Sequence, residues 1–285
     1  MTFNVLHGIF CGPSTDSCRA PARAAMLTLL LQEAGCPEIV VLQEIGPRQK
    51  EVIPPAVAGA CDDRYAIAWQ PGPPELAQVM VLSTLPIAER GYVDLAGVPW
   101  EAYWIRVETA AGTAEVLGAH FASDFNNPRC TSAICPPVCR AGITTNQCHA
   151  QEAAAFFAGR PPAALQIVAG DLNAAPDSPT VGTLTAAGFR DAWLLAGHPD
   201  CGTSGARGCT IGRRRPDNPL DGLDSRDGRY RRRIDFVLAR RGPECRLRTG
   251  AQTLATAPLA KPIEGLYWPS DHGAVLVGLT CEPPR

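Results

Sequence analysis

The sequence lacks any hydrophobic run long enough to cross a bilayer. Its longest uncharged apolar runs, such as Met26–Leu31 and Ile39–Leu42, fall well short of the roughly 20 residues that a transmembrane helix needs. The sequence also lacks an excess of basic charge, since 26 lysines and arginines stand against 28 acidic residues for a formal net charge of −2. This balance excludes a protein that coats nucleic acid through a strongly basic surface, so any contact with nucleic acid has to be local.

Lysine is nearly absent, because Lys50 and Lys261 are the only two and the other 24 basic residues are arginines. The arginines gather in the last third of the chain, at 213–215, within 226–233 and at 240–241. An arginine run is ordinarily the solvated face of a loop. If these runs line a groove, they would follow the phosphates of a polynucleotide and make binding depend on salt.

The sequence has no Cys-x-x-Cys pair, the usual element of a structural zinc site. It has twelve cysteines, an even number and more than a reduced cytosolic hydrolase keeps, which favours disulfides and an extracellular or periplasmic location. No signal peptide is visible before the first predicted strand. Zinc is the alternative, and its best candidate ligands are Cys130, Cys135, Cys139, Cys148 and His149.

Spacing alone does not fix the cysteine pairing. Three pairs would close short loops or join neighbouring strands: Cys11 with Cys18, Cys201 with Cys209, and Cys245 with Cys281.

Hydrophobic periodicity predicts an α/β protein. A strand at Thr2–Leu6, a helix at Ala22–Ala34 and a fully apolar strand at Glu38–Gln43 open the chain. A helix at His149–Phe157 and a strand at Leu165–Ala169 repeat this plan. The other predicted elements are a helix after Ser178, strands at Tyr65–Trp69, Gln78–Leu82, Ala102–Glu108 and Glu115–His120 that suggest an antiparallel meander, and late strands at Arg233–Leu238 and Ala274–Leu279.

No linker divides the chain, so we expect one domain over residues 1–285. Two stretches, the cysteine-bearing 123–148 and the arginine-rich 197–230, have little apolar periodicity and are predicted to be long surface loops.

Polar residues at predicted strand ends carry the chemistry. Asp171 and Asn173 follow the apolar strand Ile167–Gly170, which predicts that both side chains lie on one face at the edge where ligands bind in α/β sheets. A simple turn is the alternative, because Asp and Asn both favour turns. Asp271 and His272 together offer a hard oxygen ligand and a group that titrates near neutral pH.

Four further polar residues interrupt apolar strands. Asp235 lies among apolar neighbours and needs a partner, and Asn4, Glu44 and His120 lie in or at the ends of three other strands. This donor set suits Mg²⁺, with Mn²⁺ as the alternative, better than Zn²⁺. The Gly-x-Ser-x-Gly elbow is absent, so Ser270 beside His272 does not indicate a serine hydrolase.

The order of these motifs resembles the endonuclease/exonuclease/phosphatase superfamily from residue 2 to about residue 280. The segments that carry the resemblance are Thr2–Gly8 (TFNVLHG), Leu42–Glu44 (LQE), Val81–Ile87 (VLSTLPI), Gly118–Phe121 (GAHF), Gly170–Pro176 (GDLNAAP), Ile234–Val237 (IDFV) and Ser270–His272 (SDH).

The resemblance implies a four-layer α/β/β/α sandwich with two central mixed, largely antiparallel sheets and one metal-centred phosphoesterase site. It implies that Glu44 is the principal metal ligand, with Asn4 and Asp271 near the ion. The implied catalytic residues are Asp171 and Asn173 around the attacking water and the phosphate, His272 oriented by Asp235 for proton transfer, and His120 as a donor to the phosphate.

The resulting hypothesis is a secreted, monomeric, Mg²⁺-dependent phosphodiesterase that hydrolyses a phosphoester by in-line attack of water. Nucleic acid is the first substrate expected, with Arg231 and Arg232 as its contacts. Sphingomyelin or another phospholipid and inositol phosphates are the alternative substrates. A catalytically inactive, disulfide-rich binding module on the same fold is the alternative of another class.

Overall fold

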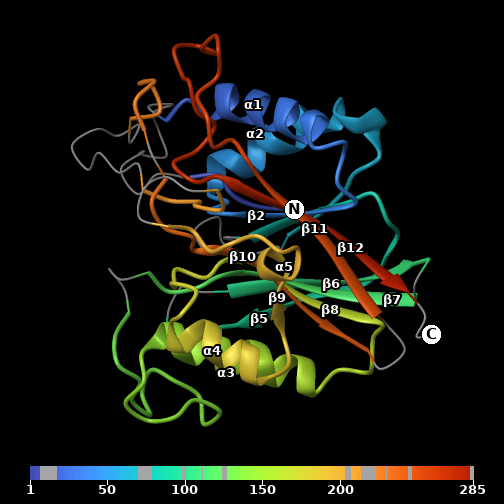
Figure 1. The fold of residues 1–285 in the computed structure, drawn as a ribbon, viewed down its shortest axis with the longest axis vertical. Coiled ribbons are helices and arrows are strands. Elements are labelled where there is room, and N and C mark those ends of the chain that lie inside the picture. The colour runs from blue at the N-terminus through green and yellow to red at the C-terminus, as the bar shows by residue number, and fades with distance from the viewer. Residues whose placement is uncertain are drawn as a thin grey trace.

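The structure is a computed structural model that describes residues 1–6, 18–69, 79–97, 101–110, 112–123, 127–202, 207–212, 222–228, 230–242 and 246–282. Two six-stranded sheets pack face to face, with helices on both outer sides (Figure 1). Helices α1 (Ala20–Glu33) and α2 (Pro47–Ala58) cover one sheet, and α3 (Thr145–Ala158) and α4 (Pro179–Ala186) cover the other. This confirms the predicted four-layer sandwich.

Both sheets are mixed and largely antiparallel. The first sheet has the spatial order β11 (Arg246–Leu254), β12 (Ala274–Glu282), β1 (Thr2–Asn4), β2 (Ile39–Gln43), β4 (Val79–Ser83) and β3 (Ala66–Trp69). The second has the order β5 (Ile87–Asp94), β6 (Glu101–Thr109), β7 (Gly112–His120), β8 (Leu165–Asp171), β10 (Asp235–Arg241) and β9 (Arg190–Asp191). The short elements η2 (Cys61–Asp63) and α5 (Ala192–Leu195) complete the described structure.

Each sheet contains one parallel pair, made by a strand–helix–strand unit. β1 pairs with β2 through α1, and β7 pairs with β8 through α3, as the two apolar repeats in the sequence predict. The other strand pairs within the sheets are antiparallel. The parallel pairs matter for function because both strands of such a pair end at the same edge of the sheet.

Apolar side chains fill all three interfaces between the layers. Alternation along β2 shows why this strand is apolar on both faces: Leu42 packs with Leu27 of α1 on the helix side, and Val41 packs with Ile105 of β6 between the sheets. Phe157 of α3 lies in the third cluster. Each such side chain contributes about 1.5–3 kcal/mol on burial, so these interfaces hold the four layers together.

Six elements were not predicted from the sequence: helix α2, strands β5 and β11, and the short elements η2, β9 and α5. Helix α2 contains Pro54 and Pro55, which argue against a helix, but its Ile53 and Val57 are buried in the core and stabilise it. Strands β5 and β11 lie at sheet edges, where strands carry many polar residues and the apolar alternation weakens. The predicted four-strand meander is also wrong, because β3 and β4 belong to the first sheet and only β6 and β7 to the second.

The two predicted surface loops differ from each other. The described part of 123–148 is irregular only as far as Thr144, and its Cys130 is buried. Helix α3 begins at Thr145 because Thr144 and Gln147 form a capping box. The described part of 197–230 is not all surface, since Cys209, Thr210 and Tyr230 are buried. Among the described residues, no helix is both long and apolar enough to span a membrane.

Candidate active site

Six strands bring polar side chains to one edge of the sandwich. Asn4, His120 and Asp171 end β1, β7 and β8, and Glu44 directly follows β2. The other two strands run antiparallel, so their beginnings reach the same edge. Asp235, the first residue of β10, is the register partner of Asp171. Asp271 and His272 lie one residue before β12, which pairs with β1.

Asn4 joins the two sheets at this edge. Its Nδ2 donates to Oε1 of Glu44 at 3.0 Å and to Oδ2 of Asp171 at 3.0 Å, although Asp171 lies 167 residues away in the other sheet. Its Oδ1 accepts from the backbone N–H of Leu6 at 3.0 Å, which fixes the orientation of the amide. Because Asn4 is fully buried, the two carboxylates are held at defined positions.

Backbone strain occurs at two of the predicted site residues. Glu44 has φ 61° and Asn173 has φ 47°, in the left-handed region that L-residues other than glycine rarely adopt. Such conformations cost of order 1–3 kcal/mol and persist where the surrounding structure enforces them, often at functional sites. In Glu44 the turn lets the side chain leave β2 toward Asn4.

The segment after β8 forms a turn, the alternative to a shared strand face, and the turn still places Asn173 beside Asp171. The strand ends at Asp171, so Asn173 does not share its face through strand alternation, and that argument was wrong. Instead the chain turns, and the backbone N–H of Asn173 donates to Oδ1 of Asp171 at 2.9 Å. The Asn173 side chain then donates to the carbonyl of Phe121 at 2.9 Å, so the turn is tied to the strand end that carries His120.

His272 and Asp235 form a buried pair that links the sheets. Nδ1 of His272 lies 2.9 Å from Oδ2 of Asp235, and the two side chains are 5% and 0% exposed. Nε2 of His272 and Nε2 of His120 each lie 3.7 Å from Oδ2 of Asp171. Two imidazoles therefore approach one carboxylate, and the Asp235 bond directs Nε2 of His272 toward it.

The electrostatics of this cluster favour proton exchange near neutral pH. Burial and the neighbouring Asp235 carboxylate raise the pKa of Asp171 to about 7, although His272 acts in the opposite direction. Burial alone would lower the pKa of His272, but the carboxylates of Asp235, Asp271 and Asp171 together raise it well above its usual value. Groups whose pKa values are perturbed in this way are characteristic of catalytic sites.

The donor set fits a hard divalent cation. Oxygens of Glu44 and Asp171 lie around the Asn4 amide, and the buried Oδ1 of Asp235 has no hydrogen-bonding partner among the described residues. Ser270 links Asp271 to Asn4, because its Oγ lies 2.7 Å from the carbonyl oxygen of Asn4 and 3.2 Å from Oδ1 of Asp271. Carboxylate and amide oxygens are the ligands that Mg²⁺ and Mn²⁺ prefer.

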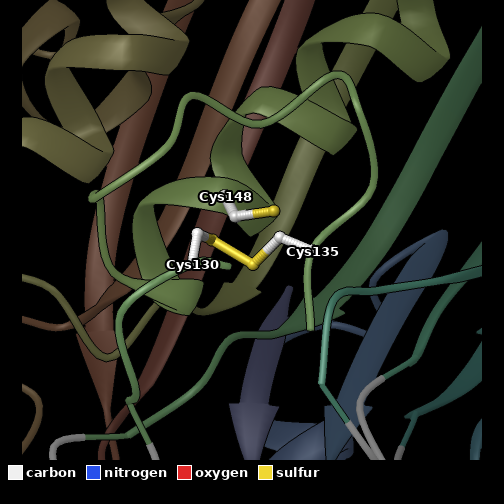
Figure 2. A group of neighbouring side chains, drawn as sticks. All are labelled: Cys130, Cys135 and Cys148. Atoms are coloured by element: carbon white, nitrogen blue, oxygen red, sulfur yellow. A yellow bond between two sulfur atoms is a disulfide. The ribbon is translucent and has the colours of Figure 1, made fainter. Parts of the chain in front are cut away.

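The zinc alternative fails, because its cysteines form disulfides. Cys130 is bonded to Cys135, and Cys139 to Cys148, whose side chain lies beside the first of these bonds (Figure 2). A disulfide sulfur is not a thiolate and does not ligate zinc. Ring nitrogen Nε2 of His149 lies instead 2.7 Å from the carbonyl oxygen of Ala96.

The other cysteines are also paired. The predicted bond between Cys201 and Cys209 is confirmed, and Cys36 is bonded to Cys61. Cys18 and Cys281 also form disulfides, whereas Cys11 and Cys245, the partners predicted for them, lie outside the described residues. The described cysteines therefore include no free thiol.

The two residues that were predicted to contact the substrate lie just before β10. Arg231 and Arg232 are exposed and directly precede the buried Arg233 and the strand that begins with Asp235. The bridge between Ile211 and Arg232 fixes their backbone. The arginines at 213–215 and Arg229 lie outside the described residues.

Asn146 of α3 also supports the site, and no pattern in the sequence pointed to it. Its Nδ2 donates to the carbonyls of Ala122 at 2.7 Å and Leu172 at 2.9 Å, which follow the strand ends of His120 and Asp171. Ala122 is held a second time, since its N–H donates to Nδ1 of His149 at 3.2 Å. Helix α3 therefore fixes two of the loops that leave the site.

Comparisons with known proteins agree with this geometry. A family model described as "Endonuclease/Exonuclease/phosphatase family" matches residues 1–272. Among curated proteins, none matches the chain.

Solved structures share the fold at low sequence identity. TDP2 of D. rerio, complexed with single strand DNA product, is 14% identical with a TM-score of 0.65, covering 98% of this chain and 96% of its own. An endonuclease/exonuclease/phosphatase family protein from Leptotrichia buccalis is 12% identical with a TM-score of 0.63, covering 99% and 98%. Truncated Caenorhabditis elegans TDP2 is 17% identical with a TM-score of 0.57, covering 92% and 91%.

Proposed function

The chain belongs to the endonuclease/exonuclease/phosphatase family and is a phosphoester hydrolase, and from this premise we propose that it is a secreted, Mg²⁺-dependent phosphodiesterase acting on nucleic acid. The observation that carries the proposal is the meeting of Asn4, Glu44 and Asp171 with the His272–Asp235 pair at one buried edge. Binding alone does not require a carboxyl group of raised pKa, such as that of Asp171, beside two imidazoles.

Glu44, Asn4 and Asp271 would hold the cation, which supplies charge neutralisation at the phosphate and at the departing oxygen. Asn4 has a second role, because its amide positions Glu44 against Asp171. The carboxylate oxygens of Glu44 and Asp271 support Mg²⁺, with Mn²⁺ as the alternative, and Asn4 would bind the cation through Oδ1, which also accepts from the N–H of Leu6.

Asp171 accepts the proton of the attacking water, for which a pKa of about 7 is suited near neutral pH. Asn173 holds the loop in which that water is bound, through its bond to the carbonyl of Phe121. As the oxygen of water bonds to phosphorus in line with the ester oxygen, the phosphorus–ester oxygen bond breaks. No covalent enzyme intermediate is needed.

His272 gives a proton to the departing oxygen, and Asp235 holds its ring in one orientation and stabilises its charge. His120, whose Nε2 lies near Asp171 on the other side, donates to a non-bridging phosphate oxygen. Together, these groups handle both protons of the hydrolysis and the charge on phosphate.

Nucleic acid is favoured as the substrate because Arg231 and Arg232 are exposed beside the strand that begins with Asp235. Two guanidinium groups at the rim bind the phosphates that flank the scissile one, which is local contact of the kind that a net charge of −2 allows. The structure of D. rerio TDP2 with single strand DNA product supports this choice by similarity of fold. An oxidising compartment is favoured because every described cysteine is in a disulfide.

The test is hydrolysis of plasmid DNA, single-stranded DNA, RNA, sphingomyelin and inositol phosphates by the oxidised protein, with Mg²⁺ and with EDTA. We expect nucleic acid to be cleaved with Mg²⁺, and cleavage to be abolished by EDTA and by Glu44→Gln, which keeps size and removes charge. Glu51→Gln is the matched control, because Glu51 is exposed on α2 and pairs only with Arg48 among the described residues. Full activity of Glu44→Gln would contradict the metal assignment.

The salt dependence of KM tests the substrate class. Replacing Arg231 and Arg232 by Gln should weaken the dependence of log(1/KM) on log[salt] by about 0.7–0.9 for each lost phosphate contact. Hydrolysis of sphingomyelin or inositol phosphates, without hydrolysis of nucleic acid, would identify one of the alternative substrates instead.

A further inference from the structure

Thr210 makes hydrogen bonds to both sides of the His272–Asp235 pair, although it is not itself part of the site. Its Oγ1 accepts from the backbone N–H of Ile234 at 3.2 Å and from that of Asp235 at 3.3 Å. Its backbone carbonyl accepts from the N–H of Gly273 at 2.8 Å, directly after His272. Thr210 is fully buried, so these bonds are shielded from water.

This bridge is needed because the two members of the pair come from different sheets. Asp235 begins β10 in the second sheet and His272 precedes β12 in the first, and no ladder of backbone hydrogen bonds joins these strands. The distance between Asp235 and His272 therefore depends on contacts that hold both backbones. Thr210 holds both, because its hydroxyl binds the N–H of Asp235 and its carbonyl binds the N–H of Gly273. A shift of a few tenths of an ångström would weaken a 2.9 Å bond between Nδ1 and Oδ2.

Thr210 is held in place by a disulfide at its neighbour. Cys209 is bonded to Cys201 with the Cα atoms 4.9 Å apart, and Cys209 is buried. The other end of this loop is anchored by Asp200, whose Oδ1 accepts from the N–H of Cys201 at 2.8 Å and from Nε of the buried Arg233 at 2.9 Å.

We propose that Thr210 is a positioning residue for the His272–Asp235 pair and that the Cys201–Cys209 disulfide fixes Thr210 in that role. The inference rests on the proposed function, because it concerns the same site. It assigns this disulfide to turnover, whereas the Cys36–Cys61 disulfide beside α1 and α2 serves stability alone.

The first experiment compares Thr210→Val, which keeps the shape and removes the acceptor, with Thr210→Ser, which keeps the acceptor. Losing this acceptor should displace the His272–Asp235 pair and lower kcat about 10- to 100-fold in Thr210→Val, since a misplacement of about 1 Å can cost about 100-fold in rate. KM should stay unchanged, since the Thr210 side chain is fully buried, and Thr210→Ser should restore most of kcat. Thr28→Val, on α1, is the control for losing a threonine hydroxyl.

The second experiment replaces the disulfides in pairs. Cys201→Ser with Cys209→Ser should lower kcat by about as much as Thr210→Val. Cys36→Ser with Cys61→Ser should lower the melting temperature more, because that bond closes 25 residues instead of 8, while leaving kcat unchanged. Equal effects of the two pairs on kcat would overturn the assignment of the Cys201–Cys209 bond.

A spectroscopic measurement separates this proposal from the proposed function. The proton on Nδ1 of His272 should give a downfield NMR resonance in the folded protein, which should broaden or vanish in Thr210→Val and return in Thr210→Ser. If the wild type hydrolyses no phosphoester, the proposed function fails and the resonance still tests the positioning. If Thr210→Val keeps both the resonance and kcat of the wild type, the positioning role is refuted.

Discussion

Asp235→Asn removes the charge that faces His272 while keeping the size of the side chain. The bond is 2.9 Å long between side chains that are 0% and 5% exposed, so little water replaces it. A hydrogen bond to a charged group contributes about 1.5–3 kcal/mol, and each 1.36 kcal/mol is tenfold in rate. We therefore expect kcat to fall about 10- to 150-fold in Asp235→Asn.

His272→Ala removes the proton-transferring group itself and should cost about 10²–10⁴ in kcat. If Asp235 acts only through His272, the double variant should be no slower than His272→Ala, since residues that act as a unit are not additive. The assay is steady-state cleavage of the best substrate from the panel, with melting temperatures as a check on folding. His198→Ala is the matched control, because His198 contacts Ala251 and Trp193 outside the site.

The stability of these variants gives a second check. Asp235 is one of the causes that raise the pKa of Asp171, so the two buried carboxylates repel each other when ionised. In EDTA, Asp235→Asn relieves this repulsion but also breaks the buried bond to His272, so the melting temperature should fall together with activity. Losses of kcat that multiply in the double variant would refute the reasoning, and Asp235 would then be a structural carboxylate.

Two further predictions concern groups outside the site. Native protein should contain no thiol that reacts with a disulfide reagent, because the described cysteines are all in disulfides, and reduction should lower its melting temperature. Titratable thiols in active protein would contradict the proposed extracellular or periplasmic location. Burial raises the pKa of Glu152 to about 7, so the folded protein binds this proton more tightly than the unfolded chain, and the stability that it contributes is lost as pH rises from 4.5 to 7. Relative to Glu152→Gln, the wild type should lose about 3 kcal/mol of unfolding free energy over this range, measured by urea denaturation, and a pH-independent difference would rule this out.

The sequence predicted the layers and the site residues for different reasons. Strands such as β2 are apolar on both faces, which is a strong local signal, and the strand–helix–strand units follow from it. Asn4 and Glu44 stood out because they interrupt or end apolar strands and occur in segments that resemble the family. The structure brings them together, whereas their roles toward a metal stay predictions.

What the sequence could not predict depends on tertiary contacts. Thr210 and Asn146 are ordinary polar residues in irregular or helical segments, and only the backbone groups that they bind make them important. The turn at Asn173 could not be predicted, because strand alternation and a turn closed by the Asp171 side chain both place Asn173 close to Asp171. The edge strand β5 lacks a buried face on most of its residues, so periodicity could not detect it.

The link between the two ends of the chain sets the order in which the site can arise. Ser270 donates to the carbonyl of Asn4 across 266 positions, and β12, which follows, pairs with β1. A ribosome therefore has to translate as far as β12 before the site can close. A nascent chain that stops before Ser270 contains the other described strands but lacks Asp271 and His272, so we expect it to hydrolyse no phosphoester until β12 is added.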